Sequence, residues 1–205
     1  MEVAAVFLPL LGFLIAGLFG RLIGDRGAMA VTVIAMVLAA AISIVLFFEI
    51  ALGGDARVLA LFTWFHSGAF QVDWALKLDT LTAVMLIVVN GVSALVHIYS
   101  IGYMAHDPHR ARFFAYLSLF TFMMLMLVTA DNLVQMYFGW EGVGLASYLL
   151  IGFWYRRPSA NAAAIKAFLV NRIGDFGFAL GIFSVFVIFG SLQFDAIFAA
   201  APGLA

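Results

Sequence analysis

The chain has 205 residues, of which 66% are hydrophobic and 10% are charged. Soluble domains are about half apolar and about a quarter charged, so this composition is that of a membrane protein. The chain contains ten Lys and Arg residues and eleven Asp and Glu residues. This balance excludes the strongly basic surface that nucleic-acid binding requires. Because cysteine is absent, disulfides, thiolate metal sites, iron–sulfur ligation and a thiol nucleophile are also excluded.

Long apolar segments dominate the chain. A hydrocarbon core of about 30 Å is crossed by a helix of about 20 apolar residues. We therefore predict an all-α polytopic membrane protein with a single transmembrane domain, 1–205. The first segment lacks a basic start and a small-residue cleavage site, so we interpret it as a retained helix rather than a signal peptide. The six predicted transmembrane helices are 3–20, 28–52, 80–103, 112–130, 132–153 and 161–190.

Short connections separate the predicted helices. Asp131 and Asn132 form a minimal turn, so the helices before and after them must be antiparallel neighbours. His106 and His109 lie three residues apart in a polar connection, and we interpret them as part of a solvated turn rather than as a metal site. Nothing caps the chain after the last predicted helix, so we expect the sequence to be the truncated first part of a longer protein.

Basic residues are distributed unevenly among the connections. Those after the first, third and fifth helices contain six Arg, whereas those after the second, fourth and sixth contain only Arg57 and Lys77. The positive-inside rule places the Arg-rich side in the cytoplasm or matrix and the N-terminus outside. Segment 53–79 is then an outer loop, and alternating stretches such as FQVDW (70–74) predict a short hairpin on the membrane surface.

Ionisable residues lie inside the last two predicted helices, where they are badly placed; these are Glu141, Lys166, Arg172 and Asp175. Each would cost about 2.5–3.5 kcal/mol at a lipid-exposed helix centre, so we expect them to face other helices, pair with each other or line water. Arg172 and Asp175 are three residues apart and can neutralise each other on one helix face. Lys166 lies on the face opposite Asp175, which leaves it free for another partner.

Glu141 lies in the apolar sequence YFGWEGVGLASYLLIGFW (137–154). It follows Asn132 by nine residues, or about 13.5 Å of helix, which places it near the bilayer midplane. Burial favours the neutral form of a carboxyl group and a nearby cation favours the charged form. A carboxyl group between these influences can exchange a proton near neutral pH, so we predict a proton relay with Lys166 as the candidate partner. The alternative is a structural ion pair, or a protonated Glu141 that bonds to a neighbouring helix.

Two sets of glycines accompany these charges. The first set surrounds Glu141, and small residues allow helices or water to approach closely. It consists of Gly139, Gly142 and Gly144. The second set recurs at helical spacing, and we interpret it as a packing seam with a neighbouring helix. It consists of Gly174, Gly177 and Gly181.

Two polar residues lie near the ends of the third predicted helix. Asp79 begins it and fits a cap position, where the helix dipole favours a negative charge. His97 follows 18 residues later, or about 27 Å further along, near the cytoplasmic end. A histidine there can pass protons because it titrates near neutrality. Beside Tyr99 and Tyr103, it is alternatively an interfacial hydrogen-bonding residue.

The segments FGWEGVGLASYLLIGFW (138–154) and AAIKAFLVNRIGDFGFALG (163–181) resemble the antiporter-like, proton-pumping membrane subunits of respiratory complex I, most closely the distal one. The resemblance runs from about Lys77 onward and is weak in the first two helices. It implies that the chain has the N-terminal part of an antiporter-like subunit fold. Further matching segments are KLDTLTAVM (77–85), HIYSIGYMAHD (97–107) and RFFAYLSLFTFMMLMLVTADN (112–132).

The resemblance also implies roles for single residues. Glu141 matches the proton-channel glutamate of the family on its fifth helix. The family has a central lysine on an interrupted seventh helix as the partner of this glutamate, and the chain ends before that position. The other matched positions are the channel-bordering pair Arg172 and Asp175, Lys166 at a similar place in the motif, and the third-helix polar positions Asp79 and His97.

The resemblance therefore implies a proton-translocating subunit of an NADH–quinone oxidoreductase, in which quinone reduction changes the surroundings of Glu141 and moves a proton. The chain has no flavin, haem or cluster ligands, so we expect flavin, iron–sulfur clusters and quinone in partner subunits and no cofactor here. The alternatives are a subunit of an Mrp-type sodium/proton antiporter and a structural membrane subunit without a transport role.

The expected surroundings follow from the same resemblance. We expect other membrane subunits of complex I as partners, especially the adjacent antiporter-like subunit, together with the lipid bilayer and without nucleic acid. The absence of cysteine and the many Ala and Gly residues favour a bacterial inner membrane over a mitochondrial one.

Overall fold

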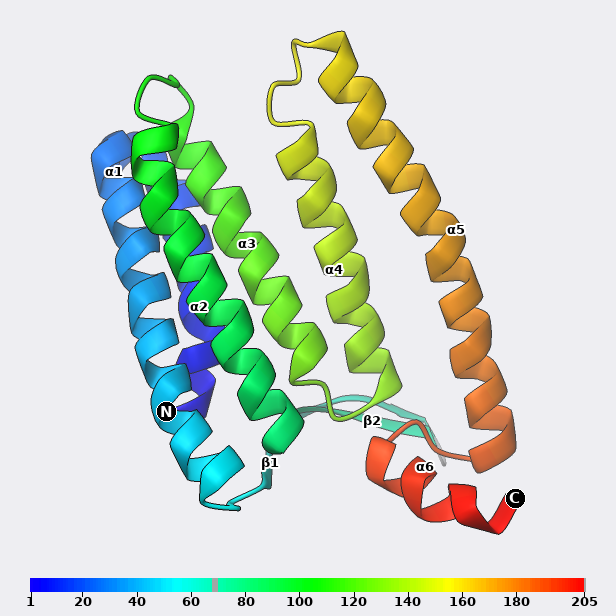
Figure 1. The fold of residues 1–205 in the computed structure, drawn as a ribbon. Helices are drawn as coiled ribbons and strands as arrows, with labels where there is room; N and C mark the ends of the chain where they lie inside the picture. The colour runs from blue at the N-terminus through cyan, green and yellow to red at the C-terminus, as the bar shows by residue number, and fades with distance from the viewer. Residues whose placement is uncertain (68–69, 205) are drawn as a thin grey trace.

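The structure is a computed structural model that describes residues 1–67 and 70–204. Its first element, helix α1 (Glu2–Leu46), is interrupted at Gly24, whose φ of 71° and ψ of 169° only glycine adopts readily. The two arms fold back on each other, since Gly12 packs against Thr32 and Ala35 and a buried cluster joins residues from both arms. Figure 1 shows them side by side. The predicted helices 3–20 and 28–52 are therefore the arms of one kinked helix, which continues into a π-helical turn (Phe47–Leu52).

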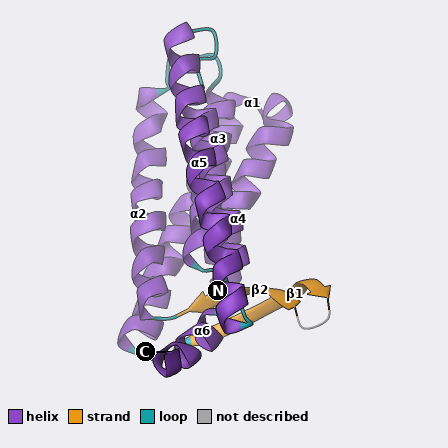
Figure 2. Cartoon of the chain, turned by 90° about the vertical axis from the view of Figure 1, so that its right-hand side faces the viewer, coloured by secondary structure: helices purple, strands orange, loops and turns teal. Residues whose placement is uncertain are grey.

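A two-stranded antiparallel sheet follows, with β1 (Arg57–Ser67) and β2 (Phe70–Leu78). The pair extends sideways from one end of the helices (Figure 2). Its Trp74 ring lies 5.0 Å from the Phe138 ring, so aromatic packing holds β2 against the helices. The hairpin predicted within 53–79 is confirmed.

Four further long helices lie close to their predicted ranges. Helix α3 packs on α1 and α4, and α5 packs on α4 and stands apart from α1, α2 and α3 (Figure 1). The antiparallel neighbours predicted on either side of Asp131–Asn132 are α3 and α4, and Asn132 caps α4 by accepting a hydrogen bond from the Gln135 amide at 2.9 Å. The elements are α2 (Thr80–Tyr103), α3 (Arg110–Val128), α4 (Leu133–Ile151), α5 (Pro158–Phe189), the short α6 (Phe194–Ala200) and a 3-10 turn (Ala201–Leu204).

Among the described residues, four helical segments are long and apolar enough to cross a membrane. Helix α4 is not in this group because Gln135, Glu141 and its glycine and aromatic residues lower its mean hydropathy. The molecule is thus a mostly helical membrane protein, and the number of six crossings stays a prediction. The four segments are Glu2–Leu52, Thr80–Tyr103, Arg110–Val128 and Pro158–Phe189.

The two glycine sets have different surroundings. A Cβ atom on Gly139 would collide with the backbone of Leu127, and one on Gly142 would collide with Met123, so these glycines allow α4 to approach α3. Among the described residues no element covers the second set, so its predicted packing seam stays a prediction. A Cβ atom at any of its positions would meet no atom within 4 Å, because that face of α5 is turned away from α4; the set is Gly174, Gly177 and Gly181.

Candidate functional site

Glu141, Arg172 and Asp175 form one charged cluster between α4 and α5. The Arg172 Nη1 atom is in an ion pair with Oε2 of Glu141, and its Nε lies 3.7 Å from Oδ2 of Asp175. One guanidinium group therefore serves two carboxylates. With both acids ionised, the cluster has a formal charge of −1.

Two neutral donors on α4 complete the cluster. The Tyr137 hydroxyl donates to Oε1 of Glu141 at 2.8 Å, and the Trp140 indole Nε1 donates to Oδ1 of Asp175 at 2.8 Å. Residues three and four apart share a helix face, so Tyr137, Trp140 and Glu141 all point towards α5. The sequence interpretation missed both aromatic residues, although the four-residue spacing between Tyr137 and Glu141 was a usable signal.

The cluster is unevenly exposed. The side chain of Asp175 is 5% exposed and that of Glu141 is 22% exposed, whereas that of Arg172 is 45% exposed. The Arg172 guanidinium lies 4.6 Å from the centre of the Phe168 ring, and Phe178 packs against Tyr137 and Trp140 at 5.6 Å. Aromatic rings thus shelter the carboxylates, while the cation remains open on one side.

Lys166 does not occupy its predicted place beside Glu141. It is exposed, and within residues 1–67 and 70–204 it forms no ion pair or hydrogen bond. Helices α4 and α5 are antiparallel neighbours in which Gly144 lies against Asn171, so Glu141 is level with Arg172. Lys166 is six residues from Arg172, or about 9 Å along the helix. The predicted neutral pair of Arg172 and Asp175 exists, but Arg172 also binds Glu141.

The remaining predicted residues, Asp79 and His97, lie on α2. Asp79 caps that helix as predicted, with Oδ1 accepting from the Thr82 amide at 2.8 Å. His97 is fully buried between α2 and α3, so its predicted alternative role as an interfacial residue is wrong. Its Nδ1 donates to the Ser93 carbonyl at 2.8 Å, and its Nε2 lies 3.1 Å from the Ser118 hydroxyl. Among the described residues, no hydrogen bond joins Asp79 or His97 to the Glu141 cluster.

Buried polar residues continue along α2 from His97. The Asn90 amide donates to the Ser43 hydroxyl at 2.8 Å and to the Ala5 carbonyl at 3.3 Å, while its Oδ1 is buried without a partner among the described residues. Asn90 and His97 are seven residues apart and share one helix face. The sequence interpretation missed Asn90, because one amide in an apolar helix gave no motif.

Two family models match the chain. One, described as NADH-Ubiquinone oxidoreductase (complex I), chain 5 N-terminus, matches residues 64–114. The other, described as NADH:quinone oxidoreductase/Mrp antiporter, TM, matches residues 130–204. The second match contains the whole Glu141 cluster. This chain belongs to the family of antiporter-like complex I subunits.

Curated relatives in this family align with nearly the whole chain. It is 58% identical over 212 residues to NADH-quinone oxidoreductase subunit L of Rhodobacter capsulatus, covering 100% of this chain and 30% of that protein. It is 54% identical over 202 residues to NADH-ubiquinone oxidoreductase chain 5 of Chondrus crispus, covering 98% and 30%. The chain therefore spans about 30% of the length of these relatives. The similarity reaches the first two predicted helices, where the resemblance had been weak.

Two solved structures share the fold of this antiporter-like chain. The membrane-bound sulfane sulfur reductase, an archaeal respiratory membrane complex, matches with a TM-score of 0.82 at 17% identity, over 96% of this chain and 39% of that chain. The Mrp complex from Dietzia sp. DQ12-45-1b matches with a TM-score of 0.80 at 23% identity, over 96% and 20%. At these identities the likeness concerns the fold alone.

Proposed function

We propose that this chain is the N-terminal part of a proton-translocating membrane subunit of an NADH–quinone oxidoreductase, and that Glu141 carries the exchanged proton. The 58% identity to a protein named subunit L of that enzyme supports the identity of the subunit. The observation that carries the role of Glu141 is its cluster, in which one guanidinium serves two sheltered carboxylates.

The charge of the cluster suggests how it exchanges a proton. Net charge inside a membrane is costly, and one proton brings the cluster from −1 to neutrality. A proton on Glu141 removes the charge that holds Nη1 of Arg172, so the guanidinium keeps Asp175 as its one anionic partner in the cluster. Loss of the proton restores the first arrangement. Glu141 is thus the proton carrier, Arg172 the switching cation and Asp175 its second anchor.

The other three predicted relay residues belong, in this proposal, to parts of the proton path that are distant from Glu141. Lys166 is exposed on α5, and Asp79 and His97 lie on α2, so none of them exchanges a proton with Glu141 directly in this arrangement. We propose that flavin, iron–sulfur clusters and quinone belong to partner subunits and that quinone reduction there alters the hydration of the cluster.

The arrangement in the membrane is also a proposal. We propose six crossings, formed by the two arms of α1 and by α2, α3, α4 and α5, with the N-terminus outside. The partners are other membrane subunits of complex I, including an adjacent antiporter-like subunit. The proposed membrane is a bacterial inner membrane, as the similarity to the Rhodobacter capsulatus protein suggests.

A second candidate is an Mrp-type sodium/proton antiporter subunit. It is favoured by the description of the family model that matches 130–204, which names both systems. The two candidates differ in their energy source, because the first uses NADH oxidation and the second uses a sodium gradient. A structural membrane subunit, whose charges only join α4 to α5, is the third candidate.

One experiment separates these candidates. Inverted membrane vesicles that contain the full-length protein are given NADH and quinone, and internal acidification is measured with sodium or potassium as the only alkali cation. We expect acidification in both media for the wild type and its loss in Glu141→Gln, with the complex assembled. The matched control is Glu49→Gln, a half-exposed acid outside the cluster, which retains acidification.

Each other outcome selects a different account. Acidification that needs no NADH and follows an imposed sodium gradient, with sodium higher inside the vesicles, supports the antiporter. Full acidification in assembled Glu141→Gln excludes Glu141 as the proton carrier. Failure of Glu141→Gln to assemble, with normal acidification per assembled complex, supports the structural role.

A further inference from the structure

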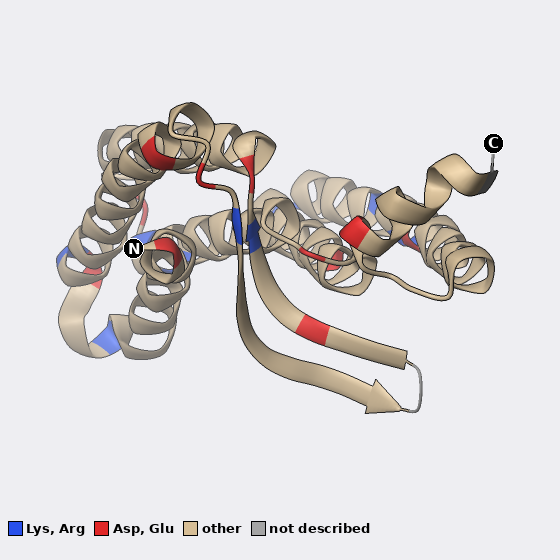
Figure 3. Ribbon diagram, turned by 90° about the horizontal axis from the view of Figure 1, so that it is seen from below, with Lys and Arg blue, Asp and Glu red and all other residues tan. Residues whose placement is uncertain are grey.

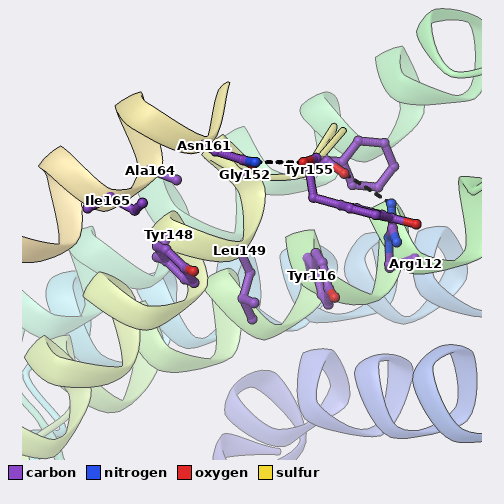
Figure 4. Close-up of a pocket in the computed structure, with 10 residues that line it drawn as sticks. Arg112, Tyr116, Tyr148, Leu149, Gly152, Tyr155, Asn161, Ala164 and Ile165 are labelled. Carbon is purple, nitrogen blue, oxygen red and sulfur yellow. Dashed lines mark hydrogen bonds between the residues drawn. The ribbon is translucent and has the colours of Figure 1, made fainter. Parts of the chain in front are cut away.

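Two cavities flank Arg112 at the beginning of α3. The first, of about 480 Å³, lies between α3, the end of α4 and the start of α5. The second, of about 680 Å³, lies between α3 and the region of α1 around its break. Three side chains line both cavities: Arg112, Tyr116 and Tyr155. Figure 4 shows Arg112 beside Tyr155 and Tyr116 in the first cavity.

Arg112 has no acidic partner among the described residues. Its Nη2 donates to the Phe153 carbonyl at 3.0 Å, and its guanidinium lies 4.7 Å from the Phe153 ring centre and 5.2 Å from that of Tyr155. These contacts fix the position of the guanidinium without neutralising it. Because a guanidinium binds phosphate oxygens well, a fixed and unpaired one beside a cavity suits a phosphate ligand.

The carboxylate of Asp107 is already engaged elsewhere. It accepts hydrogen bonds from the Trp154 indole at 2.9 Å and from the His109 amide at 2.8 Å. Burial raises the pKa of Asp107, but these bonds and the charges of His109 and Arg112 outweigh that effect, so the pKa lies below its ordinary value. Asp107 is therefore ionised at neutral pH and lessens the local positive charge without pairing with Arg112.

Positive charge nevertheless dominates this end of the molecule. The three connections 21–28, 106–112 and 155–161 contain six Arg and two Asp, a formal charge of +4. Asp25 is 3.6 Å from Arg110 and partly neutralises it. Arg21 lines the second cavity, is exposed and has no ion pair among the described residues.

Arg21 and Arg112 line the second cavity together with an apolar wall and with the carboxylate of Asp25, which is already engaged by Arg110. Phe13, Leu14 and Leu18 of α1 and Ala111 and Ala115 of α3 line it beside the cations. The arginines at the cavity entrance match the anionic phosphate of a phospholipid, and the apolar wall matches its acyl chains. A free phosphate ion would leave the apolar wall unused.

We propose that this cavity binds one anionic glycerophospholipid, with its phosphate at Arg21 and Arg112 and an acyl chain between α1 and α3. The excess of arginine favours a lipid with net negative charge over a zwitterionic one, because the latter brings its own cation to the same entrance. The site is separate from the Glu141 cluster and does not depend on the proposed proton exchange.

The test uses the assembled complex that contains the full-length protein. It is equilibrated with phosphatidylcholine vesicles that contain phosphatidylglycerol with a photoreactive acyl chain, and the labelled peptides are mapped after illumination. We expect label on the peptide that contains Leu14 and Leu18. Arg21→Gln should lower that label about five-fold, since one basic residue near an anionic lipid is worth about 1 kcal/mol.

Arg26→Gln is the matched control, because Arg26 is exposed on the same helix and lines neither cavity. It should leave the label unchanged. Three results would overturn the proposal: an equal loss in both variants, equal labelling by a photoreactive phosphatidylcholine, or the absence of label in α1 of the wild type. Competition by inorganic phosphate at millimolar concentration would instead identify an anion site and would also contradict a lipid.

Discussion

Glu141 is held between a neutral donor and a cation. The Tyr137 hydroxyl holds one carboxyl oxygen, and the Arg172 guanidinium of α5 contacts the other. In the proposed mechanism Tyr137 and Arg172 both stabilise the negative charge of the Glu141 carboxylate. A substitution can remove either partner separately.

Tyr137→Phe removes the hydroxyl and keeps the ring that packs on Phe178. A hydrogen bond to a charged group contributes about 1.5–3 kcal/mol, so we expect proton translocation to slow by about ten-fold or more with assembly unchanged. The measurement is NADH-driven acidification of vesicles, normalised to assembled complex. Tyr148→Phe on the same helix is the control, since its hydroxyl makes no hydrogen bond among the described residues. Equal rates in both variants would remove Tyr137 from the site.

The charged members of the cluster could be predicted from the sequence, because ionised groups in apolar helices need partners. The pairing could not be predicted. Helical phase placed Lys166 away from Asp175, but only the antiparallel packing of α4 on α5 sets which cation is level with Glu141. The alignment of the two helices along their axes depends on contacts such as that of Gly152 with Ala164. These residues are uncharged and belong to no recognisable motif.

Helix α4 approaches α3 closely at Gly139 and Gly142, and it meets α5 both at Gly144 and through larger side chains such as Trp140. At Gly139 the Leu127 backbone occupies the space of a Cβ atom, whereas at Gly177 on α5 that space is open in the described structure. Among the described residues, the same residue type thus has a packing role on α4 that it lacks on α5.

Gly139→Ala should destabilise the protein, because the new methyl group must displace the α3 backbone. Overpacking of this kind costs about 1–3 kcal/mol, against a gain of at most about 1 kcal/mol in helix propensity. Gly177→Ala should be neutral or stabilising. Thermal unfolding of the purified full-length protein in detergent compares them. A lower melting temperature for Gly177→Ala than for Gly139→Ala would contradict the α3–α4 packing.

The positions of the helices could be predicted from the lengths of the apolar segments. The β1–β2 hairpin could be predicted from the alternation of polar and apolar residues. The corner of α1 was predicted only as a polar connection, although helix continues on both sides of Gly24. The seam expected on α5 has no partner among the described residues and stays a prediction, because spacing identifies a face of a helix but not the element that covers it. Burial of His97 failed to follow from its neighbours Tyr99 and Tyr103, because those residues lie on exposed faces of α2.

Charge is strongly polarised along the whole molecule. The end with the break in α1 has six Arg and two Asp in its connections, a formal charge of +4. The opposite end, seen in Figure 3, has seven acidic and two basic residues, a formal charge of −5. Those residues are Glu2, Glu49, Asp55, Asp73, Asp79, Asp131, Asp195, Arg57 and Lys77.

The positive-inside rule converts this polarity into an orientation. We expect a membrane-impermeant maleimide to label Ser191→Cys from the outside of intact cells and Ser159→Cys only in inverted vesicles. Peptide mapping assigns the label, because these 205 residues contain no native cysteine. The opposite pattern would reverse the proposed orientation, and labelling of both positions from one side would contradict a single crossing by α5.

The central claim is that Arg172, rather than Lys166, controls the proton on Glu141. The most direct measurement is the number of protons translocated per NADH oxidised in assembled Arg172→Gln and Lys166→Gln variants. We predict that this ratio falls in Arg172→Gln, with a translocation rate at least about ten-fold lower, because an adjacent opposite charge is worth at least about 1.4 kcal/mol to a carboxylate. Lys166→Gln should keep the wild-type ratio. A normal ratio in Arg172→Gln together with a loss in Lys166→Gln would contradict the account.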